Sequence, residues 1–82
     1  MDTMIRLKIK KDIDNATQKK VLGLKGGLIA RSFTDIIHID DEGEEFHVNY
    51  FTPNSESRQE AIAYINNYIA EASLSNIISL VA

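Results

Sequence analysis

The chain of 82 residues has no cysteine and only one proline. Without cysteine it has no disulfide framework, no thiolate zinc site and no cysteine nucleophile. Small secreted domains usually depend on such cross-links, so we expect a cytoplasmic protein. The sequence also lacks the apolar stretch of a signal peptide, and its longest uncharged stretch, residues 72–82, is too short to span a bilayer. No membrane partner is therefore expected.

Catalytic and nucleotide-binding motifs are absent as well. The glycines in Gly23-Leu-Lys-Gly-Gly match neither a phosphate-binding loop nor a dinucleotide fingerprint. No serine lies in a nucleophile elbow beside a histidine, and carboxylate pairs occur only in one exposed turn. We therefore expect no enzyme, no catalytic residue and no cofactor.

The composition is that of a folded protein, with 44% hydrophobic and 26% charged residues. At this length, residues 1–82 predict a single domain with a thin core. The charge is divided unevenly. Residues 1–31 hold eight basic and three acidic side chains, a net charge of +5, and residues 32–82 hold one basic and nine acidic side chains, a net charge of −8. Electrostatic fields of opposite sign on two parts of a chain usually affect partner binding and solubility.

The N-terminal third predicts a strand followed by an ambiguous segment. Ile5, Leu7 and Ile9 alternate with charged residues, which indicates a half-buried strand. Residues 16–27 fit either a short helix capped by Asn15 or a hairpin. We favour the hairpin, in which residues 19–25 form a strand and Gly26-Gly27 form a two-residue turn.

A second hairpin is expected further along the chain. Residues 28–39 predict a long strand with a bulge near residues 31–35, residues 40–45 an acidic turn, and residues 46–52 a return strand. A loop centred on Glu42-Gly43 would place four apolar residues on one face, which is what determines register. These residues are Ile37, Ile39, Phe46 and Val48.

A helix is expected over residues 55–73, with Asn54 or Ser55 as its N-cap and Ile62, Ile65 and Ile69 as its apolar stripe. Residues 76–82 fit a continued helix or a short strand. The leading architecture is therefore an α+β fold, an antiparallel meander of about four strands with one C-terminal amphipathic helix packed on the sheet. The alternative is β-α-β-β-α, with residues 15–25 helical.

Two candidate sites concern protein partners. The acidic turn could mimic nucleic-acid phosphates, although charge runs are usually solvated, and the apolar C-terminal segment could dock on another chain. The protein-binding candidates are Asp40, Asp41, Glu42, Glu44, Glu45, Ile77, Ile78 and Leu80. The register above also opposes His38 to His47, which together with a carboxylate could bind zinc, but we assign no metal ligand because a site needs a third ligand and a second shell.

A third candidate site is basic. Lysines on adjacent strands would follow a phosphate backbone, although no aromatic residue on which bases could stack lies in residues 1–32. The nucleic-acid-binding candidates are Lys8, Lys10, Lys11, Lys19, Lys20 and Lys25. Aromatic side chains beside these lysines in space would favour this function.

We therefore expect a small non-enzymatic protein-interaction module, a regulator or inhibitor, such as a phage or mobile-element protein acting on a nucleic-acid enzyme. The alternative is a nucleic-acid-binding domain using the lysine-rich N-terminal segment. The expected partner is another protein, with a homodimer as one form, and nucleic acid is the less favoured partner.

Overall fold

The computed structural model of the chain describes residues 4–54 and 56–81. In chain order the elements are β1 (Ile5–Lys10), α1 (Asn15–Ala30), β2 (His38–Glu42), β3 (Phe46–Phe51), α2 (Arg58–Glu71) and β4 (Ile78–Val81). The α+β class and a four-stranded antiparallel sheet are therefore confirmed, but the described chain has two helices where the leading prediction has one.

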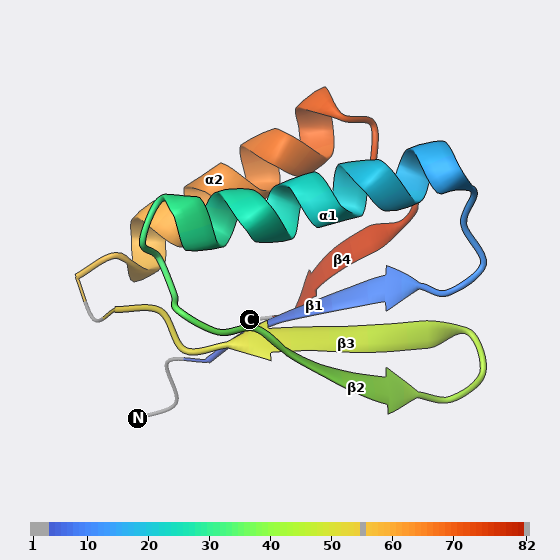
Figure 1. Cartoon of the computed structure of the whole chain (residues 1–82), viewed down its shortest axis with the longest axis horizontal. Coiled ribbons are helices and arrows are strands. Elements are labelled where there is room, and N and C mark those ends of the chain that lie inside the picture. Colours follow the sequence, from blue (N-terminus) through green and yellow to red (C-terminus); the bar gives the residue numbers. More distant parts are fainter. Residues whose placement is uncertain (1–3, 55, 82) are drawn as a thin grey trace.

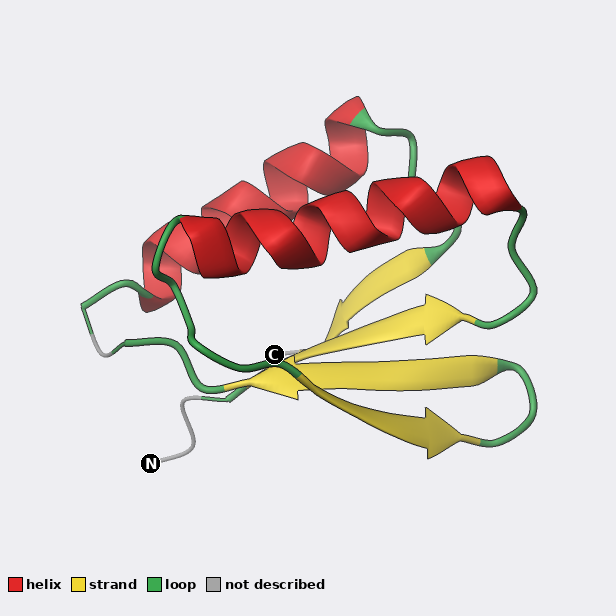
Figure 2. Ribbon diagram, viewed as in Figure 1, coloured by secondary structure: helices red, strands yellow, loops and turns green. Residues whose placement is uncertain are grey.

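The strands lie in the order β2-β3-β1-β4, and all neighbours are antiparallel. The predicted meander is wrong, because β1 lies between β3 and β4 rather than beside β2. Each helix joins two parallel strands that have a third strand between them, the split β-α-β arrangement of ferredoxin-like folds. Both helices cover one face of the sheet, and no described element covers the other (Figure 1, Figure 2). This topology carries many unrelated functions, so it identifies none by itself.

The core lies between the sheet and the helices. Ile5, Leu7 and Ile9 of β1 are at most 3% exposed, which confirms the alternation predicted for this strand. They pack in one cluster with side chains from both helices, namely Val21, Leu24, Leu28, Ala61, Ile65 and Ile69. No helix in the described ranges is both long and apolar enough to cross a bilayer.

Residues 15–25 are helical, so the favoured hairpin with a turn at Gly26-Gly27 is wrong and the helical alternative is correct. The glycines of α1 allow the two helices to approach closely. A Cβ atom on Gly23 would lie 2.5 Å from the Tyr68 hydroxyl oxygen, and one on Gly27 would collide with the Tyr64 hydroxyl. These residues lie four positions apart, on one side of the helix, and they make room for α2.

The strand predicted over residues 28–39 is wrong for most of its length. α1 continues to Ala30, and the chain then leaves the helix through Ser32, whose φ is 63°. Phe33 is buried beneath this connection. Extended structure begins only at His38, the first residue of β2.

The hairpin between β2 and β3 has a different register from the predicted one. Glu42 pairs with Phe46 across a three-residue loop, in which Gly43 has a φ of 71°. Ile39 therefore lies opposite Asn49 and not opposite Phe46. The observed register differs from the predicted one by an odd number of residues. Because side chains alternate between the two faces of a sheet, this difference moves the side chains of one strand to the other face. The apolar residues predicted to share a face are thus divided between the two faces.

The helix predicted for residues 55–73 is confirmed as α2. Ile65 is fully buried and Ile69 is 9% exposed, while Ile62 is partly buried against the core. The predicted apolar stripe therefore faces the interior. β4 follows this helix, so α2 is not the last element of the chain.

The helix caps differ from the predicted ones. The N-cap of α1 is Asp14 rather than Asn15, and its carboxylate accepts a hydrogen bond of 2.7 Å from a backbone amide in the first turn. Hydrogen bonding to the Thr17 side chain, together with this backbone bond, holds the pKa of Asp14 below its ordinary value. The N-cap of α2 is Ser57, without a side-chain bond, rather than Asn54. The other predicted cap, Ser55, lies outside the described residues.

The C-terminal segment forms β4, an edge strand paired with β1. Ile78 is 2% exposed, and Ile77 and Leu80 are partly buried against the core. Of the predicted docking residues of this segment, Ile78 is thus part of the core, while Ile77 and Leu80 remain partly exposed. Ala82, the last residue of the predicted segment, lies outside the described residues.

Candidate functional surface and cleft

The uncovered face of the sheet brings side chains of β1, β3 and β2 into three parallel stripes. Backbone pairing aligns them in rows, which are Arg6–Tyr50–His38, Lys8–Val48–Asp40 and Lys10–Phe46–Glu42. We call these nine residues the open face. Along the strands they form a basic stripe on β1, an aromatic and apolar stripe on β3, and a stripe with two carboxylates on β2.

Lys8 contacts both neighbouring stripes. Its Nζ lies 4.5 Å from the centroid of the Phe46 ring, a cation–π distance. The same Nζ lies 3.8 Å from Glu42 Oε1, with both side chains partly exposed. Exposed ion pairs contribute little stability, so these charges remain available to a partner.

Tyr50 is half-buried at the other end of the aromatic stripe. The His38 ring stacks on it with centroids 5.0 Å apart and an interplanar angle of 22°. Partial desolvation raises the pKa of Tyr50, and the neighbouring Asp40 carboxylate adds to the effect. The Tyr50 hydroxyl is therefore a neutral donor at physiological pH.

The acidic turn is tied to the end of β1. Lys11 Nζ lies 3.3 Å from Asp41 Oδ1 and donates a hydrogen bond of 3.0 Å to the carbonyl of Gly43. Lys11 thereby holds the pKa of Asp41 below its ordinary value. Of the predicted protein-binding acids, only Asp40 and Glu42 reach the open face. Asp41 points to the other side of the sheet, and Glu44 and Glu45 lie in the exposed loop.

The predicted stripe of lysines on adjacent strands is wrong. Lys8 and Lys10 lie on the open face, whereas Lys19, Lys20 and Lys25 belong to α1, on the opposite side of the sheet. The reason is the helical structure of residues 15–25, which removes the second basic strand. Arg6, which the set of candidates omits, takes its place on the open face.

The two histidines lie on opposite faces, so the predicted pairing is wrong. His38 stacks on Tyr50, while His47 Nδ1 lies 3.2 Å from Asp41 Oδ1, an ion pair when the imidazole is protonated. Within residues 4–54 and 56–81, no three His, Asp or Glu side chains converge in a way that could hold a metal ion.

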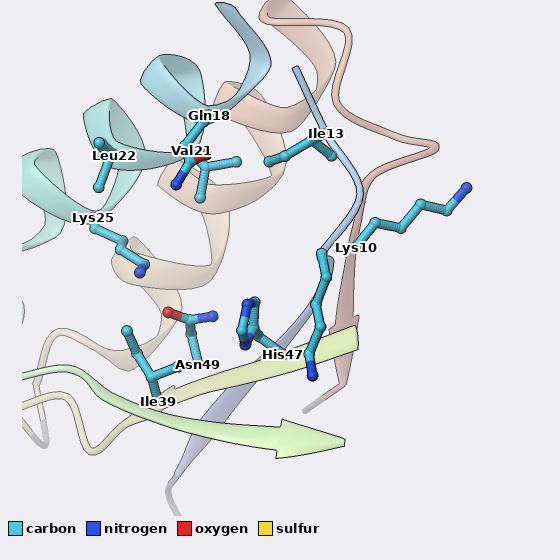
Figure 3. A pocket seen from close by; sticks show the side chains of 10 residues that line it. Lys10, Ile13, Gln18, Val21, Leu22, Lys25, Ile39, His47 and Asn49 are labelled. Atoms are coloured by element: carbon cyan, nitrogen blue, oxygen red, sulfur yellow. The ribbon is translucent and has the colours of Figure 1, made fainter. Parts of the chain in front are cut away.

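A cleft of about 180 Å³ lies on the helix side, between α1 and the β2–β3 hairpin (Figure 3). Apolar side chains form much of its wall, and polar groups enter it from both elements. The lining residues are Lys10, Lys11, Ile13, Gln18, Val21, Leu22, Lys25, Ile39, His47 and Asn49. The cleft exists because the edge strand β2 extends beyond the cover of the helices, and Ile39 is 54% exposed.

Phe46 and Tyr50 are the open-face residues that sequence reasoning missed. The predicted register placed Phe46 on one face with Ile37 and Ile39, whereas it lies on the open face and Ile39 on the other. The alternation of Phe46, Val48 and Tyr50 with two polar residues points the wrong way, because Asn49 is buried while Phe46 and Tyr50 are only half-buried.

Comparisons with known proteins leave the class of this chain undetermined. No protein-family model matches it, no curated protein matches it, and no solved structure matches it. The function must therefore be argued from the open face and the cleft.

Proposed function

We propose that this chain is a small, non-enzymatic protein-interaction module that binds its partner through the open face. The observation that carries the proposal is the ordered separation of charge, with a basic stripe and an acidic stripe on either side of an aromatic one. A regulator or inhibitor acts by occupying a surface of its target, and this face offers an apolar centre flanked by charges that direct orientation.

The order of the stripes defines the partner. A surface that packs against this face needs acidic groups over β1, apolar groups over β3 and basic groups over β2. A second copy meets this requirement. A two-fold axis along β3 places β1 of one copy over β2 of the other and lets the two β3 strands pack together. In this arrangement Lys10 faces the partner's Glu42, and Phe46 packs on the partner's Phe46.

The dimensions of the face set the expected affinity. At the usual strand spacing of about 4.8 Å and rise of about 3.3 Å per residue, the three strands of the open face offer roughly 270 Å² on each copy. Stable complexes typically bury about 800 Å² on each partner. Self-association is therefore expected to be weak, in the micromolar range or above.

Sedimentation equilibrium over a wide range of protein concentration tests this proposal. We expect a monomer–dimer equilibrium that weakens at high salt, because salt screens the exposed charges. Amide NMR shifts that depend on protein concentration should map to β1, β2 and β3. A monomer at all concentrations and salt levels would exclude the second copy as partner. Tight binding of a different protein to the open face would still support a protein-interaction module.

A specific observation favours single-stranded nucleic acid as a second candidate. Phe46 and Tyr50 lie beside the basic stripe, and such rings stack on bases while cations bind phosphates. The adjacent acidic stripe repels phosphates, so a protein partner ranks first. Fluorescence anisotropy with short single-stranded DNA and RNA decides between them. Binding that falls with salt and is lost in Tyr50→Ala would establish nucleic acid as the ligand.

A further inference from the structure

In the cleft between α1 and the β2–β3 hairpin, Lys25 and Asn49 carry polar groups that have no partner among the described residues. Lys25 is partly buried, forms no hydrogen bond or ion pair with the described residues, and has its pKa lowered by burial. Asn49 is 2% exposed, and its Oδ1 is fully buried without a hydrogen-bond partner among the described residues. Buried polar atoms are nearly always paired in folded proteins, so this acceptor calls for a donor.

The two groups come from opposite walls and point toward the same space (Figure 3). One is a cation that needs an anion, and the other is an acceptor that needs an O–H or N–H donor. Val21, Leu22 and Ile39 supply apolar surface around them. A ligand that fits must therefore carry an anionic oxygen and a hydrogen-bond donor close together, and it must also carry a short apolar chain.

From this arrangement we propose that the cleft binds a small carboxylic acid with a hydroxyl or ammonium group on the neighbouring carbon and a short branched aliphatic chain. The carboxylate pairs with Lys25, the neighbouring group donates to Asn49 Oδ1, and the chain lies against Val21, Leu22 and Ile39. The site is on the opposite side of the sheet from the open face, so the proposal does not rest on the proposed function.

The volume of the cleft agrees with a ligand of this size. Its roughly 180 Å³ slightly exceeds the engineered cavity of about 150 Å³ that accommodates benzene. An acid with a branched aliphatic chain fills such a space.

Amide NMR titration of the whole chain with matched probes tests the proposal. The probes are 2-hydroxy-4-methylpentanoate and leucine, with 4-methylpentanoate lacking the donor and 2-hydroxy-4-methylpentanamide lacking the charge. We expect the first two to shift resonances of residues 21, 22, 25, 39 and 49. Loss of the donor should weaken binding about fivefold, the usual effect of one net hydrogen bond.

Variants separate this site from non-specific binding. Lys25→Gln removes the charge and leaves a polar side chain that is one atom shorter, and it should weaken binding about tenfold. The matched control is Lys19→Gln, an exposed lysine of the same helix outside the cleft, which should leave binding unchanged. Equal affinity in both variants would overturn the proposal. So would an absence of shifts in the cleft at millimolar concentrations of the probes, or equal binding of 4-methylpentanoate.

Discussion

The backbone of Gly27 lies directly beneath the hydroxyl of Tyr64, at a distance that leaves no room for a side chain on α1. The Tyr64 ring is itself held in place, 5.9 Å from the Phe33 ring and 4.8 Å from the Arg31 guanidinium. The preceding glycine, Gly26, has nothing within 4 Å of the position that its Cβ atom would take. Adjacent glycines of one helix thus have different roles.

This difference predicts opposite effects of the same substitution. Gly26→Ala should raise the free energy of unfolding by about 0.5–1 kcal/mol, because alanine is the better helix former and nothing obstructs it. Gly27→Ala forces Tyr64 to move, so we expect its unfolding free energy to fall below that of Gly26→Ala by about 1–3 kcal/mol. Chemical denaturation of both variants measures the difference, and equal stabilities would show that the helices separate easily.

Ile65 provides a test of the core on the α2 side. It is fully buried, so Ile65→Ala should lower the free energy of unfolding by about 2–4 kcal/mol. Ile36→Ala is a suitable control, since Ile36 is 60% exposed and its loss should change stability by less than about 0.5 kcal/mol. A denaturation midpoint unchanged by Ile65→Ala would mean that α2 does not pack as described.

The N-cap residue Asp14 should make part of the free energy of unfolding depend on pH in the acidic range. Its pKa in the folded chain is lowered by hydrogen bonding to the Thr17 side chain and to the Thr17 backbone amide. Its stabilising effect is therefore complete above the ordinary aspartate pKa of about 3.9, and it is lost as the pH falls through the lowered value. Asp14→Asn keeps the cap but should remove this part of the acid sensitivity. Thermal denaturation between neutral and strongly acidic pH compares the two, and curves of identical shape would contradict the assignment.

Part of this fold could be predicted from local patterns. The alternation at Ile5, Leu7 and Ile9 and the helical spacing at Ile65 and Ile69 report burial on one side of an element, so both predictions were correct. α1 was mistaken for a hairpin because its glycines resemble a turn. The reason for Gly23 and Gly27 lies in the tyrosines of α2, about forty residues later in the chain, and no local pattern contains that information.

The open face was only partly predictable. The basic stripe on β1 follows from alternation alone, so Lys8 and Lys10 were found. The aromatic stripe depends on the register of the β2–β3 hairpin, which hydrophobic pattern specifies poorly because every residue of β2 is exposed. Once Phe46 had been grouped on one face with Ile37 and Ile39, its position beside Lys8 could not be predicted.

The most direct test of the central claim uses two charge-reversed variants, Lys10→Glu and Glu42→Lys. Each reversal places like charges opposite one another in the two-fold pairing, so each variant alone should be more monomeric than the native chain at the same concentration. Mixing them should restore association, because Glu at position 10 of one copy then faces Lys at position 42 of the other, while the native pair of Lys10 and Glu42 remains on the other side of the axis. Repulsion within a single molecule cannot be relieved by mixing.

Lys19→Glu, on the far side of the molecule, is the control and should associate as the native chain does. Sedimentation at low salt is the measurement. A mixture heavier than either variant alone is the predicted result, and a mixture that sediments as the average of its two components would contradict the account.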